Sequence, residues 1–198
     1  MDPTLSLFAE TGAYLKGHFR LTSGLHSPEF LQCALVLQHP KYAERLGRAM
    51  AHKLQLSENG SPNAATDTVV APAMGGLMIG HEVARALGVR SIFTERDAEG
   101  KMVLRRGFTV RPGERCVVIE DVITTGGSTK EVVEVLRALG AVVVAAGSII
   151  DRSGGKADVG VPRVALVEMN VTAWKPEECP LCAEGVPAVK PGSRPANA

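Results

Sequence analysis

The chain has 198 residues, which is enough for one well-buried α/β domain with a small appended element. Its 22 lysines and arginines nearly balance its 21 aspartates and glutamates, so we expect no basic surface for nucleic acid or an anionic membrane. The sequence has no apolar run of about 18 residues and so predicts no membrane span. Its start, MDPTLSLFAE, is acidic and does not predict a secretory signal. We therefore expect a cytoplasmic protein whose four cysteines are reduced.

The first 38 residues predict a small hood that precedes the main domain. A short amphipathic helix is expected near the N-terminus, within residues 1–16. Two short strands and the breaks between them should follow, with the strands at 18–22 and 29–34 and the breaks at Ser23–Gly24 and Ser27–Pro28.

Periodic apolar residues predict an α/β core over residues 40–170. A helix of about four turns is expected at 40–54, and the polar stretch 57–67 is typical of a surface loop. The strands expected after this loop are 68–71, 91–94, 116–119, 142–150 and 164–167. The helices expected between them end at Gly88 and Gly140. This alternation predicts a parallel sheet with helices on both faces and ligands at the carboxyl ends of the strands.

The stretch from Cys116 to Gly140 carries the strongest functional signal. A buried strand ends at two acids, Glu120 and Asp121, and the loop Thr124–Ser128 then leads into a helix. The loop glycines let the backbone approach an anion, the hydroxyls add donors, and the helix start supplies N–H groups and a positive dipole end. Carboxylates beside a phosphate site suit a ligand that also carries hydroxyls or a divalent cation, as a ribose phosphate does.

The acid pair also predicts where the strand ends. Neighbouring residues on a regular strand point to opposite faces, so both acids can face the ligand only if the turn begins at Glu120 and Asp121. The alternative is an ordinary capped turn with solvated acids.

A second glycine pair follows the strand at 68–71, in the loop Pro72–Gly76. The helix after it predicts a second anion site, with a diphosphate as its occupant. The alternative is a tight turn that allows close helix packing.

The charged segment Glu95–Arg106, with a turn at Glu99–Gly100, is typical of a lid that excludes water from an active site. Its cations are Arg96, Lys101, Arg105 and Arg106. Arg96 is the preferred active-site candidate because it follows the strand end most closely, and solvated surface charge is the alternative for the others.

These motifs resemble a known family. VVIEDVITTGGS is similar to the signature with which type I phosphoribosyltransferases bind phosphoribosyl diphosphate (PRPP), and neither GxxxxGK[ST] nor GxGxxG is present. The hood, with a phenylalanine followed by xSG, xxSP and an aromatic or apolar pair, resembles the start of orotate phosphoribosyltransferases. The resemblance spans about Gly12 to Arg152. It implies the α/β type I phosphoribosyltransferase fold, a central parallel sheet flanked by helices with a small N-terminal hood, in a homodimer.

The resemblance implies an activity as well. The protein is expected to transfer ribose 5-phosphate from PRPP to orotate, giving orotidine monophosphate and diphosphate in de novo pyrimidine (UMP) biosynthesis. Mg²⁺ is the implied cofactor, bound mainly through PRPP rather than by protein ligands. Two rivals stay open: a purine or uracil phosphoribosyltransferase, and a non-catalytic regulator that senses PRPP.

Individual residues take roles from the same resemblance. Glu120 and Asp121 would hold the ribose, and with Arg96 they form the expected catalytic set. The further PRPP contacts would be Val122, Ile123, Thr124, Thr125, Gly126, Gly127 and Ser128. The expected orotate contacts are Thr124, Phe30 and Arg152, the last on the orotate carboxylate. For Arg152 the alternative is a plain surface motif with Asp151.

The chain departs from the family at three places. Thr22 and Gly75 stand where many members carry lysines. At Thr22 an expected charged ligand contact is missing, and Arg20 and His26 are the nearby candidates to replace it. At Gly75 backbone amides would have to hold the diphosphate. The lid, which related enzymes share with the partner subunit, lacks the usual histidine.

Residues 174–198 form a C-terminal tail that is expected to fray. The tail holds Cys179 and Cys182, a single C-x-x-C pair. Without a second pair or nearby histidines the pair lacks the four ligands of a structural zinc site, unless a second subunit supplies them. His18 and His26 in the hood are interpreted as surface or hydrogen-bonded loop histidines.

Overall fold

The computed structural model describes residues 2–21, 24–57 and 66–191. They form two compact units. The core unit is Leu37–Met169, and the terminal unit combines Met1–Val36 with Asn170–Ala198. The predicted hood and tail therefore belong to one unit. Thr22, Ser23 and most of the predicted 57–67 loop lie outside the described residues.

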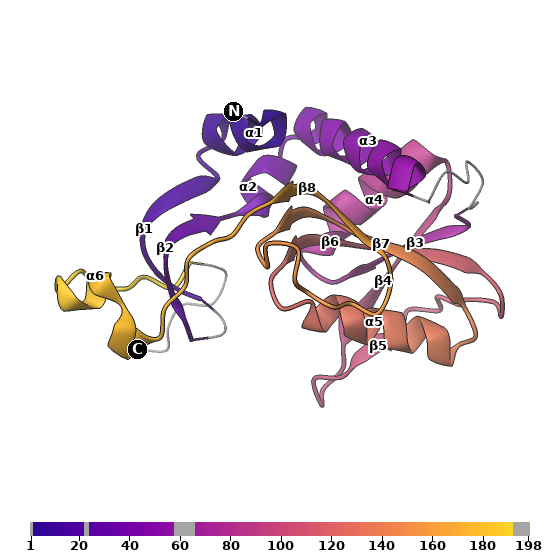
Figure 1. Cartoon of the computed structure of the whole chain (residues 1–198). Coiled ribbons are helices and arrows are strands. Elements are labelled where there is room, and N and C mark those ends of the chain that lie inside the picture. Colours follow the sequence, from indigo (N-terminus) through magenta and orange to yellow (C-terminus); the bar gives the residue numbers. More distant parts are fainter. Residues whose placement is uncertain (1, 22–23, 58–65, 192–198) are drawn as a thin grey trace. The chain divides into compact units, whose positions relative to one another are not determined.

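A six-stranded sheet forms the centre of the core unit, in the order β5-β4-β3-β6-β7-β8 (Figure 1). Its strands are β3 (Thr68–Pro72), β4 (Arg90–Arg96), β5 (Met102–Leu104), β6 (Arg115–Ile123), β7 (Val142–Asp151) and β8 (Arg163–Glu168). Neighbouring strands are parallel except β5, which is antiparallel to β4. The predicted parallel sheet is confirmed, and the carboxyl ends of its parallel strands lie at one edge.

Helices cover both faces of this sheet. In Figure 1, α3 (Pro40–Ser57) and α4 (Gly76–Leu87) lie on one side, and α5 (Gly127–Ala138) lies on the other. Val118 of β6 packs in the buried cluster that includes Val132 and Leu136 of α5. In the part of the chain that the structure describes, none of the helices combines the length and apolar character of a bilayer-crossing segment.

The central strand β6 is longer than predicted. It continues past Ile119 and through the acid pair to Ile123, so the prediction of a turn at Glu120 and Asp121 was wrong. The neighbouring strand β7 is ten residues long, and its Ser148 and Asp151 pair with Glu120 and Ile123. Because the partner strand extends this far, the backbone groups of β6 keep their ladder partners through the acids.

The charged segment after β4 is a hairpin as far as Leu104. Arg96 pairs with Met102 and Thr94 with Leu104, so the start of the predicted lid forms the edge of the sheet. The turn is where it was predicted, with Gly100 at φ 81°. Asp97 closes the turn, because its carboxylate accepts the backbone N–H groups of residues 99 and 101.

The terminal unit contains α1 (Pro3–Glu10), the antiparallel pair β1 (Tyr14–Arg20) and β2 (His26–Leu31), and the short helices η1 (Pro176–Glu178) and α6 (Pro180–Ala183). A further short helix, α2 (Cys33–Leu37), ends at the first residue of the core unit. The predicted hairpin is confirmed, but both strands begin and end earlier than expected. The break predicted at Ser27–Pro28 was wrong. Pro28 lies inside β2, where the pairing register shifts and a missing N–H removes no regular ladder bond.

The described part of the tail is not frayed. Val189 bonds through its backbone to residues 18 and 20 of β1, and Trp174 exchanges two backbone hydrogen bonds of 2.8 and 2.9 Å with His26 of β2. The two ends of the sequence are therefore joined within the terminal unit by backbone pairing.

Candidate active site

The loop after β6 has the backbone geometry expected of an anion site. Gly126 caps α5 with φ 82° and offers no side chain to the first turn of the helix. The hydroxyl of Thr125 lies 3.5 Å from the N–H of Gly127, which it accepts only weakly. The first N–H groups of α5 and the positive end of its dipole thus point toward the loop, where a phosphate would accept hydrogen bonds from these N–H groups.

Only glycine fits at position 126. A Cβ there would lie 2.8 Å from Val159 Cγ1 and 3.3 Å from the Cβ of Ala157, and the left-handed φ already disfavours other residues. The loop therefore packs directly against the segment that follows β7.

The second glycine loop meets the acid pair. Gly75 caps α4, and a Cβ at this position would lie 2.7 Å from both carboxylate oxygens of Asp121. The carboxylate thus occupies the space that a side chain at residue 75 would need. The structure brings together the acid and the second loop, which lie 46 residues apart in the sequence and at the ends of two neighbouring strands.

The two acids form a coupled pair even though β6 stays a strand there. Glu120 is 8% exposed, Asp121 is half-buried, and their side chains are hydrogen-bonded to each other. The pKa of Glu120 lies well above its ordinary value, because burial disfavours its charged form and the charge of Asp121 lies beside it. Two oxygen-rich groups under mutual repulsion are suited to hydroxyls or a cation.

Arg152 follows β7 at the same edge of the sheet. Its backbone N–H donates to the carbonyl of Ile123 at 2.8 Å, which places it at the entrance to the phosphate loop. Asp151 is fully buried, forms an ion pair with Arg163 and accepts two hydrogen bonds from Ser153. The alternative of a plain Asp151–Arg152 surface motif is therefore wrong. Sequence reasoning missed Arg163, because nothing in its own stretch points to a partner 12 residues earlier.

Three of the four cations of the predicted lid, Arg96, Arg105 and Arg106, pair with acids in this structure. Arg96 donates to both carboxylate oxygens of Glu131 on α5, at 2.8 and 3.2 Å, and to the carbonyl of Gly100. Arg105 and Arg106 pair with Glu95 at 3.7 and 2.9 Å. These pairs are largely exposed, so each contributes at most about 1 kcal/mol and can exchange partners at little cost.

Phe30 lies in β2 of the terminal unit. It is half-buried, and its ring centroid is 5.8 Å from that of Phe19. Its predicted contact with a base stays a prediction.

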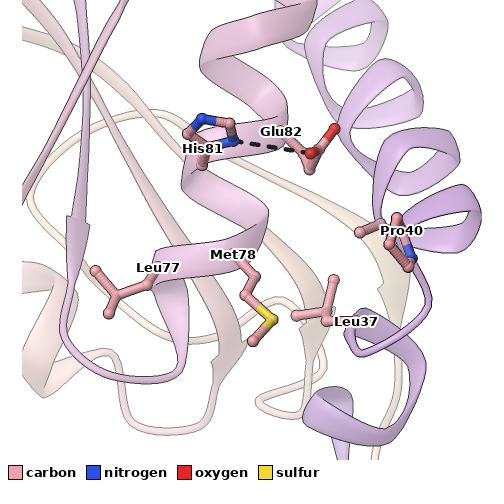
Figure 2. Close-up of a pocket in the computed structure, with 7 residues that line it drawn as sticks. Leu37, Pro40, Leu77, Met78, His81 and Glu82 are labelled. Atoms are coloured by element: carbon pink, nitrogen blue, oxygen red, sulfur yellow. Dashed lines mark ion pairs between the residues drawn. The ribbon is translucent and has the colours of Figure 1, made fainter.

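A pocket of about 320 Å³ in the core unit lies along the start of α4, directly after the second glycine loop. Figure 2 shows it between α4 and the start of α3, lined mostly by apolar side chains such as Leu37, Leu77 and Met78. None of the predicted site residues lines it. Its only charged lining group, Glu82, is paired with His81 at 3.7 Å and with Arg85 at 2.6 Å. It offers little of the polar surface that a phosphorylated sugar requires.

Fold and loops together define an α/β protein with a site for a phosphorylated ligand that also presents hydroxyls or a cation. Residues 35–179 match the family described as the phosphoribosyl transferase domain. The orotate phosphoribosyltransferase of Desulforamulus reducens is 53% identical over 98% of this chain and 97% of its own, and that of Heliobacterium modesticaldum is 56% identical over 98% of both.

A solved orotate phosphoribosyltransferase from Aeropyrum pernix superposes with a TM-score of 0.66 at 26% identity, covering 82% of this chain and 92% of its own. An adenine phosphoribosyltransferase from Thermoanaerobacter pseudethanolicus, at 20% identity and a TM-score of 0.59 over 71% of this chain and 88% of its own, shares the fold alone. The chain belongs to the phosphoribosyltransferase family, and within it to the orotate phosphoribosyltransferases. The fold class predicted from the sequence is confirmed.

Proposed function

We propose that the protein transfers ribose 5-phosphate from PRPP to orotate, giving orotidine monophosphate and diphosphate in de novo synthesis of UMP. The observation that carries the proposal is an identity above 50% along nearly the whole length of relatives named for this activity. The contact between Asp121 and Gly75 supports it physically, because one acid lies beside the loop that suits the leaving diphosphate.

In this proposal the protein binds PRPP at three points. The 5-phosphate binds the loop Thr124–Ser128 and the first N–H groups of α5. The diphosphate binds backbone amides after β3, since Gly75 has no side chain to contribute. Glu120 and Asp121 accept hydrogen bonds from the ribose hydroxyls, and their mutual repulsion is relieved when those donors arrive.

Mg²⁺ is the cofactor that the family implies, and the site has suitable ligands. Asp121 and Glu120 are the hard oxygen donors that this ion prefers, and they would hold it only jointly with PRPP oxygens. When bound, the ion neutralises charge on the departing diphosphate.

The chain's own residues supply positioning and electrostatics. The bond between the ribose anomeric carbon and the diphosphate oxygen breaks, and its electron pair leaves with the diphosphate. A ring nitrogen of orotate bonds to the same carbon and gives up its N–H proton to the diphosphate or to water. The oxocarbenium-like sugar between these events is cationic, so the acid pair stabilises it. No covalent nucleophile is needed.

Arg152 holds the orotate carboxylate in this proposal, with Thr124 and Phe30 on the base. We predict that Arg152→Ala raises the KM for orotate about a hundredfold while the KM for PRPP changes less than about threefold. Steady-state kinetics with each substrate varied measures this. Arg48→Ala, on the exposed face of α3, is the matched control. Equal losses for both substrates would make Arg152 a structural residue.

We also propose a cytoplasmic homodimer in which the lid acts on the partner's site, with Arg96 exchanging Glu131 for the diphosphate. Both substrates are anions, which do not cross a bilayer unaided, and this supports the location. Mixing an inactive Asp121→Asn subunit with an Arg96→Ala subunit should restore part of the activity. If the mixture stays as inactive as its parents, the lid is not shared.

The deciding experiment is a substrate screen. With PRPP and Mg²⁺ present, the purified protein should remove the ultraviolet absorbance of orotate and leave uracil, adenine and hypoxanthine unchanged. Turnover of one of these bases instead would establish the rival transferase. PRPP binding without any turnover would establish the regulator.

A further inference from the structure

Four side chains that sequence reasoning treated separately meet in the terminal unit. His18 comes from β1, His26 from β2, and Cys179 and Cys182 from the tail. One ligand atom of each lies within 4.8 Å of the others. Three of the four residues are buried, and Cys182 is exposed. Two imidazoles and two thiols are the ligand set of a structural zinc site.

The distances fit one tetrahedral ion. Zn–N bonds of about 2.0 to 2.1 Å and Zn–S bonds of about 2.3 Å place neighbouring ligand atoms roughly 3.3 to 3.8 Å apart. Cys179 Sγ and Cys182 Sγ lie 3.4 and 3.8 Å from His18 Nε2, and Cys182 Sγ lies 3.3 Å from His26 Nδ1. The two ring nitrogens are 2.8 Å apart, so this separation has to widen by about half an ångström, and the two remaining separations, which involve Cys179 Sγ, are at most 4.8 Å.

An outer hydrogen bond orients the first ligand. Nδ1 of His18 lies 2.6 Å from the carbonyl oxygen of Val186. A carbonyl can only accept, so Nδ1 carries the proton and Nε2 directs its lone pair into the cluster. Metal-bound histidines use this arrangement, in which the second ring nitrogen donates to a backbone carbonyl.

The backbone brings the ligands together. Arg20 pairs with His26 across the hairpin, and His18 lies two residues before Arg20, at the irregularity where the strand register shifts. This irregularity lets the His18 ring meet the His26 ring, with Nε2 of the first 2.8 Å from Nδ1 of the second. The cysteines flank Pro180 in one helical turn, and the backbone N–H of Cys182 donates to the carbonyl of Cys179. This turn aims both sulfur atoms the same way.

The terminal unit also has a physical need for such a link. Its sheet has only two strands, which alone are marginally stable in water, and small units of this kind are often stabilised by a metal. The metal would link residues that lie 161 positions apart in the sequence. A cross-link that closes so long a loop lowers the conformational entropy of the unfolded chain more than one that closes a short loop.

We propose that His18, His26, Cys179 and Cys182 bind one Zn²⁺ ion that fastens the C-terminal tail to the N-terminal hairpin. All four positions are taken by the protein, so the ion is structural and takes no part in the chemistry. The prediction that C-x-x-C lacks nearby histidines was wrong. The partners lie more than 150 residues away, and a histidine spacing set by strand pairing has no local signature.

Metal content tests the proposal without relying on activity. The full chain, purified under reducing conditions without a metal-affinity step, should contain about one zinc per chain by mass spectrometry. Cys182→Ser should lose nearly all of it, and because Cys182 is exposed we expect the variant to fold. Cys33→Ala, a buried cysteine of the same unit, is the matched control and should keep the metal.

Cobalt substitution gives a second readout on the unaltered chain. Protein refolded with Co²⁺ should show the intense visible bands of a tetrahedral site and a near-ultraviolet sulfur-to-cobalt band, both absent in Cys182→Ser. The proposal is overturned if the reduced chain takes up no zinc or cobalt, if the cobalt spectrum is octahedral, or if both cysteine variants retain the metal equally. A Cys179–Cys182 disulfide found by mass spectrometry in freshly purified protein also overturns it.

Discussion

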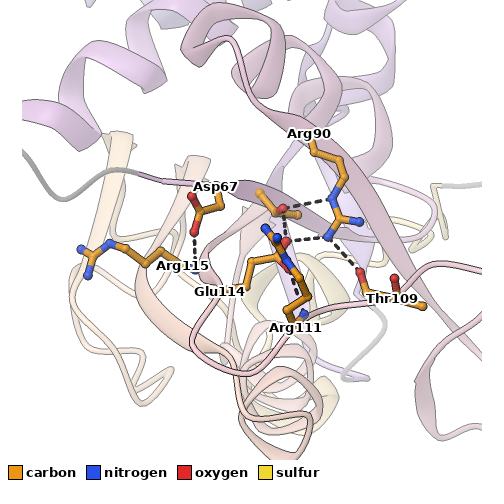
Figure 3. Close-up of polar contacts among 7 residues, drawn as sticks. Asp67, Arg90, Thr109, Arg111, Glu114 and Arg115 are labelled. Atoms are coloured by element: carbon orange, nitrogen blue, oxygen red, sulfur yellow. Dashed lines mark hydrogen bonds and ion pairs between the residues drawn. The ribbon is translucent and has the colours of Figure 1, made fainter.

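Two buried glutamates at opposite ends of β6 have opposite surroundings. Glu114 precedes the strand and is 5% exposed, while Glu120 lies near its carboxyl end and is 8% exposed. Glu114 accepts hydrogen bonds from the Thr68 hydroxyl at 2.6 Å, the Arg90 guanidinium at 2.5 Å and the Arg111 N–H at 2.9 Å. Figure 3 shows Arg90 and Arg111 on either side of it. Glu120 has another carboxylate as its neighbour.

The pKa values of the two groups move in opposite directions. Burial alone would raise the pKa of Glu114, but bonds from the Arg111 backbone, Thr68 and Arg90 outweigh it and lower the pKa to about 2. For Glu120, burial and the charge of Asp121 both raise the pKa. At similarly low exposure, hydrogen-bond donors therefore stabilise the charge at one end of the strand, and a neighbouring acid destabilises it at the other.

The two glutamates therefore differ in role: Glu114 stabilises the fold, and Glu120 belongs to the candidate active site. At the amino end of the sheet both carboxylate oxygens of Glu114 have donors, which is what a buried charge that only holds the fold requires. At the carboxyl end the unliganded protein tolerates a strained acid pair beside two glycine loops. Perturbed carboxyls of this kind mark sites that become satisfied when a ligand arrives.

The largest effect is expected at Asp121. Asp121→Asn keeps the shape but removes the charge beside the sugar, so turnover should fall about a hundredfold or more with the melting temperature nearly unchanged. Orotate-dependent absorbance decay measures it. Asp67→Asn is the control at the amino end, where Asp67 accepts the N–H of Arg115, and it should keep full activity. Near-normal turnover in Asp121→Asn would remove the acid pair from the mechanism.

Glu114→Gln should instead lower stability and spare activity. The folded pKa of about 2 lies below the ordinary value, so the ionised group contributes about 3 kcal/mol above pH 5, and this contribution is lost as the pH falls toward 2. The variant should lose about 2 to 3 kcal/mol at pH 7, and the two proteins should converge in acid. Urea unfolding across pH tests both statements. A pH-independent difference would contradict the assignment.

Gly126→Ala and Gly113→Ala compare the loops at the carboxyl and amino ends of β6. A Cβ at 126 meets Val159 at 2.8 Å, whereas one at Gly113, which has nearly the same φ, meets nothing within 4 Å. We expect PRPP affinity to fall about tenfold in Gly126→Ala and to stay unchanged in Gly113→Ala. Both variants carry a backbone strain of about 1 kcal/mol, but only Gly126→Ala displaces the loop that we propose for the phosphate. Calorimetric titration with PRPP measures this. Equal affinities would place the phosphate elsewhere.

Glu120→Gln should show the smallest stability effect, opposite in sign to that of Glu114→Gln. Because the folded pKa of Glu120 is raised, its ionisation disfavours the fold increasingly as the pH rises above the ordinary value. The variant should therefore unfold at higher urea than the unaltered protein at pH 8, with no difference near pH 4. Its turnover should fall at least tenfold. A less stable variant at pH 8 would mean that the charge is paired in the folded protein.

Some features could be predicted because a single local stretch encodes them. The run VVIEDVITTGGS identified strand, acids, phosphate loop and family together, since the chemistry of a βα turn is contained in consecutive residues. The α3 and α4 helices and the Gly88 stop followed from periodicity. Strand ends did not follow, because β6 continues to Ile123 only where β7 supplies a partner.

The sequence by itself determined the α/β class, the family and the glycine loop that we propose for the phosphate, because these depend on side chains that are neighbours along the chain. Only the tertiary structure decided that Asp121 fills the space beside Gly75, that Arg163 neutralises Asp151, and that two histidines and two cysteines converge. Each of these depends on which strands and segments lie side by side. That pairing results from burial and backbone hydrogen bonding over the whole chain, and no short stretch of residues contains it.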